Sequence, residues 1–544
     1  MKTTLRIKLQ AGSGLHGKAL EKACAEALKV PLNVISHVRL CRLSLDARPK
    51  IPCYEALVEV YTAPDRYVEP VYHFEMKKAA VSKKQAGVVV VGMGPAGLFA
   101  ALALCHAGVK VTLLERGKKV DERAKDVGAL CREGRLDTES NYAYGEGGAG
   151  CFSDGKLYTR SSKRGDISRV MRTFVHYGAD PAILYQAHPH LGSDRMPAIV
   201  RRMREALLEA GAEIRFSTCV KEILTDSKGR FAAVVDQNGV EYKGDVLFLA
   251  TGNSADDLYR YIDRKGWALE EKPFALGVRV EHPQALINAL QYKGAEKRCD
   301  LPPAEYAFVE KTSLCDIFSF CMCPGGVVIP AATEKDGLVV NGMSGSGRHG
   351  SWANAGWVGG VNRDLLVAEG CRLSPGVFGL LDYRRALERR FFEAGRAFAA
   401  GDGQNFIAPA QRMTDFLKGK VSRNLPATSY TRGVCSVDMN GLLPAYIARS
   451  LQEAFRQVEA KRRGFLTQEA LLLGLESRTS SPVRIPRDSD TFEHPQVAGF
   501  YPCGEGAGYA GGITSSALDG LNCAESYLRD RGMDCNFAIV KTEI

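Results

Sequence analysis

Three glycines near the start of a long apolar stretch have the spacing of a loop that binds phosphate. Gly92, Gly94 and Gly97 form a G-x-G-x-x-G pattern between a run of valines and an apolar segment that ends in glycine. The first glycine allows a tight turn, the second lets the backbone approach a pyrophosphate, and the third lets a helix pack closely on a strand. The N-terminus of that helix offers free N–H groups and a partial positive charge to the phosphates.

An acidic residue completes this pattern. Glu115 ends the next apolar run, 18 residues after Gly97, where a carboxylate can accept hydrogen bonds from ribose hydroxyls. Strand, turn, helix, second strand and acid follow in this order, so the sequence predicts a dinucleotide site. The alternative is a tight strand–helix turn without a ligand. NAD and FAD both fit the pattern, and the predicted contacts include the neighbouring Pro95, Ala96 and Arg116.

The same segment could be mistaken for a membrane span. Residues 86–114 are long and apolar enough for one. Their internal order is instead a short β-branched run, a glycine turn, a short helix and a second short strand. This order is typical of a parallel βαβ unit, whose strands are covered on both faces.

A second glycine-rich cluster lies more than 400 residues later, at 501–520, "YPCGEGAGYAGGITSSALDG". Glycine weakens helices and strands, so such a cluster indicates turns or backbone that approaches another group closely. Its densest part holds one acidic side chain, Glu505. A helix is expected to start at Gly511 and Gly512, with Thr514 and Ser515 available to cap it. The alternative is a glycine loop at the surface.

Two further stretches complete the predicted site. In "YGEGGAGCFSDGKLYT", residues 144–159, backbone N–H groups of closely spaced glycines can face phosphate oxygens, and a hydroxyl and an ammonium stand nearby; a plain flexible loop is the alternative. The apolar run at 245–249 ends in three small residues that let the backbone lie against a dinucleotide. The residues concerned are Gly147, Gly148, Gly150, Ser153, Lys156, Ala250, Thr251 and Gly252.

In these motifs the chain resembles the two-dinucleotide-binding-domain flavoproteins of the glutathione-reductase type. The resemblance implies FAD in an extended conformation, with the Val220 backbone near the adenine. It also implies that the acid after Gly504 contacts the ribityl chain, where Glu replaces the usual Asp. The helix start at 511–514, including Ile513, would point at the flavin ring and stabilise negative charge on it.

A narrower resemblance covers the chain from about residue 30 to its end. "GEGGAGCFSDGKL", "APAQRMTDFL", "GLESRTSSPVRIPRD" and the late glycine cluster resemble an uncharacterised family of bacterial FAD-dependent dehydrogenases. That family's fold and flavin are implied, but no substrate is. No His or Cys stands in the context of a covalent attachment site, so the FAD is expected to be non-covalent.

The predicted fold class is α/β. It consists of a Rossmann-like FAD-binding domain with an inserted α+β substrate domain and a small N-terminal α+β module. The expected bounds are 1–80 for the basic module, 85–270 for the first part of the FAD domain, 271–485 for the insert and 486–544 for the return segment, with a linker at 76–85. No second G-x-G-x-x-G followed by an acid is present, so a dedicated NAD(P)H domain is not expected. NADH or NADPH binding transiently over the flavin stays open.

Candidates for substrate binding come from two places. Arg478 and Arg484 stand in "LESRTSSPVRIPRD", and the arginine fork suits carboxylate or phosphate. The alternative, an Arg–Glu pair that fixes the insert to the FAD domain, is left open. Cys321 and Cys323 are interpreted either as soft packing residues at a buried strand end or as a thiol facing the flavin. The ring that a C-x-C disulfide closes is small and strained, and no further metal ligands stand nearby.

The sequence therefore predicts an FAD-dependent oxidoreductase that passes a hydride between FAD and an unidentified small molecule, with no catalytic side chain assigned. In the alternative, the N-terminal module binds RNA or a protein partner, in RNA modification or redox sensing. Residues 1–85 hold 15 Lys and Arg against 8 Asp and Glu, but no RNP-like aromatic motif, so nucleic acid is not the favoured partner. Sixteen scattered cysteines and the lack of a secretory pattern predict a cytoplasmic protein without membrane contact; the oligomeric state stays open.

Overall fold

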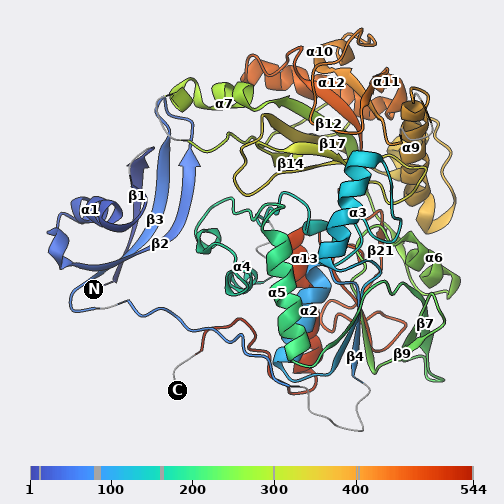
Figure 1. Ribbon diagram of the computed structural model, residues 1–544, viewed down its shortest axis with the longest axis horizontal. Coiled ribbons are helices and arrows are strands. Elements are labelled where there is room, and N and C mark those ends of the chain that lie inside the picture. Colours follow the sequence, from blue (N-terminus) through green and yellow to red (C-terminus); the bar gives the residue numbers. More distant parts are fainter. Residues whose placement is uncertain are drawn as a thin grey trace.

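The structure is a computed structural model, and it describes residues 2–11, 14–65, 67–78, 87–159, 165–297, 301–399, 401 and 405–541. It shows the predicted α/β architecture: a Rossmann-like parallel sheet, a large inserted α+β region and a small N-terminal module (Figure 1). Most of the linker expected at 76–85 lies outside the described residues.

The parallel sheet carries the first glycine motif. Its five strands have the order β22-β10-β4-β5-β6, and every neighbouring pair is parallel. The four valines of β4 are all buried, as expected for a strand covered on both faces. The strands are β4 (Val88–Val91), β5 (Val111–Leu114), β6 (Glu213–Arg215), β10 (Val246–Leu249) and β22 (Phe500–Pro502).

The last strand and last helix come from the C-terminal end of the chain, which confirms the predicted return to this sheet. β22 pairs with β10, with Phe500 opposite Leu247. Helix α13 (Ile513–Arg529) then packs beside α2 (Pro95–His106), and Figure 1 shows the two helices together against the sheet. A Cβ on Gly520 would collide with the Ala96 carbonyl. Helix α2 is apolar almost all round, as expected for a helix that is covered on every side. Most residues of α13 are also buried, although several of them are polar.

The remaining elements of this region cover and extend the sheet. An antiparallel three-stranded sheet, β7-β8-β9, lies between β6 and β10 in sequence. The elements are α3 (Val120–Glu133), α4 (Ile167–His176), α5 (Met196–Glu209), β7 (Val220–Thr225), β8 (Phe231–Asp236), β9 (Glu241–Lys243) and α6 (Asp256–Arg264).

The inserted region is built on a mixed sheet with the order β13-β14-β17-β12-β20-β18-β19. Its core includes Trp357, which is fully buried, and the helices α9 and α12 pack against it. The strands are β12 (Phe274–Pro283), β13 (Val309–Glu310), β14 (Ile317–Cys323), β17 (Trp352–Val361), β18 (Ala408–Arg412), β19 (Val434–Ser436) and β20 (Leu471–Glu476). The helices are α7 (Gln284–Tyr292), α8 (Arg363–Ala368), α9 (Gly379–Arg396), α10 (Met413–Phe416), α11 (Met439–Leu442) and α12 (Ala445–Lys461).

Two short antiparallel pairs connect the insert to its surroundings. The hairpin of β15 (Val327–Pro330) and β16 (Val340–Met343) lies between β14 and β17 in sequence. β11 (Glu270–Glu271) pairs with β21 (Val483–Arg484), so the entry to the insert and the exit from it run side by side. Because the two ends of the insert pair with each other, the insert does not interrupt the five-stranded parallel sheet.

The N-terminal module is a three-stranded antiparallel sheet, β1-β3-β2, with α1 on one face. Figure 1 shows it at the side of the molecule, away from the parallel sheet. Its other face carries basic side chains, but two glutamates lie among them: Glu59 is 2.8 Å from Lys2 and 3.2 Å from Arg39, and Glu55 is 3.8 Å from Lys8. The elements are β1 (Lys2–Gln10), α1 (Gly17–Leu28), β2 (Ile35–Asp46) and β3 (Cys53–Thr62).

Within the described residues, no helix combines the length and the apolar character that crossing a bilayer requires.

Candidate functional site

A long cavity lies where the carboxyl ends of the parallel strands face the insert. It encloses about 1710 Å³ of space, part of it open to solvent. The residues that follow β4, β5 and β10, namely Gly92, Glu115 and Ala250, all line it. This edge is where open α/β sheets bind their ligands. The opposite wall comes from the insert, through Phe320, Cys321, Ile329, Ala331, Val339, Asn341, Gly342, Arg478 and Thr479.

The three glycines of the first motif have different surroundings. Gly92 has φ +100°, and a Cβ there would collide with the Ala250 carbonyl. A Cβ on Gly97 would collide with the Gly92 carbonyl, so this glycine serves the close contact of α2 with β4 and does not line the cavity. A Cβ on Gly94 would meet only the Gly148 Cα, at 3.7 Å. Gly94 caps α2 and lines the cavity, together with Pro95 and Ala96.

Glu115 lines the cavity and also holds three backbone segments together. One carboxylate oxygen accepts the Met93 N–H at 2.7 Å, and the other accepts the N–H groups of Gly117 at 2.8 Å and Gly145 at 2.9 Å. The sequence predicted only a ribose contact for this residue. The structure adds the bracing role, which fixes the glycine turn relative to the 144–159 loop.

Arg116 closes the same end of the cavity. Its guanidinium lies over the Tyr144 ring, 4.4 Å from the ring centre, and forms ion pairs with Glu139 at 2.5 Å and Asp257 at 3.1 Å. Val220 lines the cavity beside it. The flat arginine–tyrosine stack gives this end a rigid polar wall.

The 144–159 loop contributes part of its predicted residues. Gly148, Gly150 and Ser153 line the cavity, whereas Gly147 and Lys156 do not. The Gly147 N–H donates to the Met93 carbonyl at 2.9 Å. Lys156 turns to the insert, where its ammonium donates to the Met322 carbonyl.

A fully buried arginine that sequence reasoning missed supports this loop. Arg123, on α3, donates to the backbone carbonyl of Asn141, just before the loop, at 2.8 Å and to that of Glu146, in the loop, at 2.7 Å. Its side chain replaces the regular backbone hydrogen bonds that the loop lacks. Nothing in the local sequence distinguishes this residue from the exposed arginines of a helix.

The return segment supplies the wall at the other side of the glycine turn. Glu505 lines the cavity and accepts from Asn253 at 2.7 Å, and burial raises the pKa of its carboxyl to about 7. Gly504 does not line the cavity; its N–H donates to Asp519 at 2.7 Å. Gly504 therefore makes a contact within the fold, whereas Glu505 faces the cavity.

Helix α13 begins at this wall without a side-chain cap. Gly511, Gly512 and Ile513 line the cavity. The expected capping by Thr514 and Ser515 is wrong: Thr514 donates to the Leu157 carbonyl at 2.7 Å, outside the cavity lining, and Ser515 accepts the Gly511 N–H at 3.2 Å. Glycine at the cap lets the helix start against empty space, so the positive end of the helix dipole faces the cavity.

The small residues of this lining fit a bound dinucleotide. A Cβ added at Gly252, Gly511 or Gly512 would meet no protein atom within 4 Å, although all three line the cavity, as do Ala250 and Thr251. Their lack of side chains therefore leaves room for a ligand and serves no internal packing contact.

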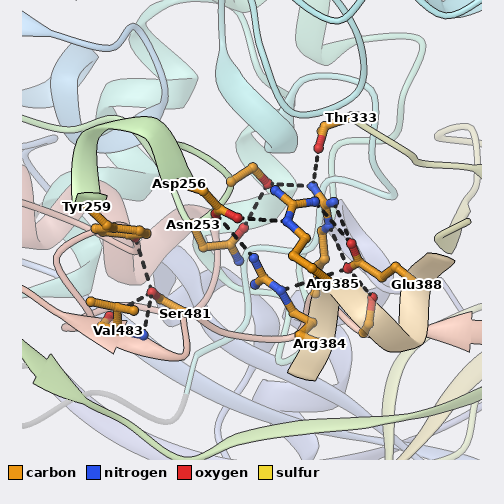
Figure 2. Close-up of polar contacts among 12 residues, drawn as sticks. Asn253, Asp256, Tyr259, Thr333, Arg384, Arg385, Glu388, Ser481 and Val483 are labelled. Atoms are coloured by element: carbon orange, nitrogen blue, oxygen red, sulfur yellow. Dashed lines mark hydrogen bonds and ion pairs between the residues drawn. The ribbon is translucent and has the colours of Figure 1, made fainter. Parts of the chain in front are cut away.

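Arg478 lies at the centre of an ion-pair network at the insert side. It donates to Glu388 of α9 at 3.0 and 3.1 Å, to Glu334 at 2.8 Å and to Ser254 at 3.0 Å. Figure 2 shows this network, in which Arg384 and Arg385 of α9 reach Asp256. The bonds from Arg478 to Ser254 and from Arg384 and Arg385 to Asp256 join the insert to the segment after β10. Both glutamate partners of Arg478 lie within the insert, so its Arg–Glu pairs do not themselves link the insert to the FAD region. Arg478 also lines the cavity.

The second candidate arginine lies elsewhere. Arg484 does not line the cavity; its nearest carboxylate is Glu270 at 3.5 Å, and 39% of its side chain is exposed. Arg487, three residues on, pairs with Asp519 at 2.6 Å and lies over the Tyr509 ring. The arginines of this motif thus separate into one cavity residue and two that fix the chain locally.

The two cysteines end strand β14, as expected from the sequence. Cys321 lines the cavity, and Cys323 is fully buried behind it. Beneath them lies Arg279 of β12, fully buried, which donates to Glu476 at 2.9 Å and to the Cys321 carbonyl at 2.9 Å. Sequence reasoning missed Arg279, because its partners are far away in the chain. Within the described residues, no cluster of three or more His, Cys, Asp or Glu side chains is placed to hold a metal ion.

Comparison with known protein families identifies the cofactor. Residues 85–131 match a family described as "FAD binding domain", and residues 273–479 match one described as "FAD-dependent protein, C-terminal domain-like". Residues 1–61 match a domain of unknown function. The protein is therefore a flavoprotein, and FAD is its cofactor.

A full-length relative places the chain in a particular family. It is 37% identical over 522 residues, 93% of this chain and 95% of the relative, to an uncharacterised protein of Clostridium beijerinckii. This chain belongs to the same family as that protein.

Solved structures with a similar fold are distant. One is CtdE in complex with FAD, 12% identical over 84% of this chain and 87% of that chain, with a TM-score of 0.33. Another is the halogenase PltM, 11% identical over 82% of this chain and 70% of that chain, with a TM-score of 0.37.

Proposed function

We propose that this protein is an FAD-dependent oxidoreductase that transfers a hydride between a small-molecule substrate and non-covalent FAD. The observation that carries this proposal is the cavity: one wall consists of glycine-rich backbone from the FAD-binding region, and the other consists of side chains from the insert. Bound FAD supplies the redox chemistry, while the protein supplies position and electrostatics.

The proposed orientation follows the two walls. Gly94, at the start of α2, would bind the pyrophosphate, and Val220 and Arg116 would enclose the adenosine end. Gly512, at the start of α13, would face the flavin ring, as in the extended arrangement of glutathione-reductase-type flavoproteins. The N-terminus of α13 would then stabilise negative charge on the ring.

The substrate would enter beside the insert. Phe152, Phe320 and Asn341 line this end of the cavity, which suits a small molecule with an apolar body and a polar group. We also propose that the segments 1–80, 85–270, 271–485 and 486–544 are the structural units. The fifteen described cysteines are all free thiols, which supports a reducing, cytoplasmic setting.

Anaerobic flavin reduction tests this function. The purified holoprotein is mixed with NADH, NADPH and a panel of metabolites, and the flavin absorbance is followed. We expect one donor to bleach the flavin and an acceptor to restore it. If dithionite bleaches the flavin but no biological donor or acceptor changes it, the oxidoreductase proposal is wrong.

The alternative, RNA binding by the N-terminal module, has less support. Glu55 and Glu59 lie among the basic side chains of its open face, so the positive charge available to phosphates is reduced. A titration with RNA at low salt is expected to show no binding. Salt-dependent binding would favour the alternative.

A further inference from the structure

Strand β14 changes register at the point where it reaches the cavity. Phe320 pairs with Gly356, but Cys323 pairs with Asn354, so β14 contains one residue more than β17 over this interval. Cys321 lies in this bulge with φ +45°, a left-handed conformation that is uncommon for a residue other than glycine. Bulges of this kind re-aim a side chain and occur next to active sites.

The bulge gives the two thiols different positions. Cys321 lines the cavity, whereas Cys323 has no exposed surface. The Cys323 thiol donates to the Cys321 carbonyl at 3.4 Å. Cys321 therefore lies at the cavity surface, and the buried thiol of Cys323 lies in contact with it.

Two cations lie against this pair. The Lys156 ammonium donates to the carbonyl of Met322, the residue between the cysteines, and Arg279 donates to the carbonyl of Cys321 at 2.9 Å. Cationic neighbours favour the thiolate form of cysteine. The charged and titratable groups that act on Cys321 from the surrounding elements are Cys323, Lys156, Arg279, Asp154 and Glu476.

These surroundings divide the two thiols chemically. The neighbouring Cys323 side chain, followed by the charges of Lys156 and Arg279, lowers the pKa of Cys321 below its ordinary value, although burial opposes this. The same contact and burial raise the pKa of Cys323 well above its ordinary value. Burial raises the pKa of Cys315, just before the same strand, which is what packing alone produces.

We propose that Cys321 and Cys323 are a redox-active dithiol pair that reduces a small organic disulfide at the insert end of the cavity. The inference rests on the proposed function, because it names the substrate class of that site. A nucleophilic thiolate toward the cavity and a buried second thiol behind it are the two parts that stepwise disulfide exchange needs.

The proposed chemistry balances in two steps. The Cys321 thiolate attacks one sulfur of the organic disulfide, forms a mixed disulfide and releases one thiolate. The Cys323 sulfur then attacks Cys321, forms the Cys321–Cys323 bond and releases the second thiolate, which takes the Cys323 proton. Reduced FAD bound in the cavity would supply the two electrons and one proton that restore the Cys321 thiolate and the Cys323 thiol.

The small ring supports a catalytic pair. A C-x-C disulfide closes a short, strained ring, which makes it a poor structural bridge. Strained disulfides have more oxidising potentials and are therefore easily reduced. The ring strain that argues against a permanent Cys321–Cys323 disulfide therefore favours a disulfide that forms and is reduced again in each catalytic cycle.

The test uses the holoprotein with its thiols reduced and its FAD oxidised, so that the flavin cannot restore the dithiol, and the aromatic disulfide dithiobis(nitrobenzoate). We expect the wild type to release two equivalents of aromatic thiolate rapidly and to contain a Cys321–Cys323 bond, located by peptide mass spectrometry. Cys323→Ser should release one equivalent and keep the adduct on Cys321. Cys321→Ser should react at this site at least 100-fold more slowly, and Cys315→Ser, the matched control, should behave as the wild type.

Two outcomes would overturn the proposal. One is a wild type that keeps a stable adduct on Cys321 or forms no bond between the two cysteines. The other is alkylation of Cys321 by iodoacetamide that needs a pH as high as alkylation of Cys315 does, because the pKa of Cys321 is expected to be the lower of the two. The FAD content of the same samples is measured after denaturation. A protein without FAD would contradict the proposed function, and the thiol exchange could still be tested separately.

Discussion

The two ends of the cavity are built in different ways. At the sheet end the lining is mostly backbone, with glycines such as Gly94 and Gly252 where a side chain would project into empty space. At the insert end the lining is side chains, including Cys321 and Arg478, whose partners come from distant segments. This difference supports the proposed division, in which the sheet end binds the backbone-recognised part of FAD and the insert end binds the substrate.

Substitution of Gly94 by valine should produce the largest effect and is confined to the sheet end. A Cβ at this position meets only the Gly148 Cα at 3.7 Å, so the protein should fold, but the valine side chain occupies the space beside the start of α2. We expect FAD affinity to fall about 1,000-fold, or about 4 kcal/mol, measured by flavin fluorescence titration. Gly360→Ala, also in open space but outside the cavity, is the control; equal losses in both variants would contradict this assignment.

Arg478→Met tests the ion-pair network of the insert end. Glu388 is 1% exposed and would lose its two bonds from Arg478, so we expect the free energy of unfolding to fall by about 3 kcal/mol. Urea unfolding measures it. Arg389→Met on the same helix removes an exposed pair with Asp336 and should cost under about 0.5 kcal/mol. A difference of less than 1 kcal/mol between the two variants would show that the buried pairs of Arg478 do not stabilise the fold more than an exposed pair does.

Glu505 provides a pH-dependent comparison with the insert end. Burial raises the pKa of its carboxyl from 4.5 to about 7 in the folded protein, so the folded state favours the protonated form. In protein stripped of FAD, the contribution of Glu505 to the free energy of unfolding is greatest below pH 4.5. It falls by about 3 kcal/mol as the pH rises to about 7. Thermal unfolding of the wild type and Glu505→Gln measures it. Equal pH slopes in the two proteins over this interval would rule out the effect.

The smallest effect is expected at Arg484, six residues from Arg478 in the same motif. Its side chain is 39% exposed and does not line the cavity. Arg484→Met should leave FAD affinity unchanged and alter the free energy of unfolding by no more than about 0.5 kcal/mol. A loss of unfolding free energy as large as that of Arg478→Met would contradict the assignment of Arg478 to the buried network and of Arg484 to the surface.

The two ends also differ in how far the sequence predicted them. The glycine turn and Glu115 belong to one short βαβ segment, and the spacing of its glycines and acid in the sequence determines the backbone geometry that they need. The fold and the sheet end of the cavity could therefore be predicted. Arg279 and Glu476 are 197 residues apart, and their contact exists only after two strands pair. No periodicity or motif records such a contact. The expected cap at Thr514 failed for a related reason, since the partner of that hydroxyl, Leu157, belongs to a distant loop.

The central claim is that one FAD molecule spans both ends of this cavity. A crystal structure of the protein grown with FAD tests it most directly. We predict the pyrophosphate beside Gly94, the adenine beside Val220 and the flavin ring between the start of α13 and Cys321. An FAD bound elsewhere, or one with its flavin ring beside Val220 and its adenine beside Cys321, would contradict the account.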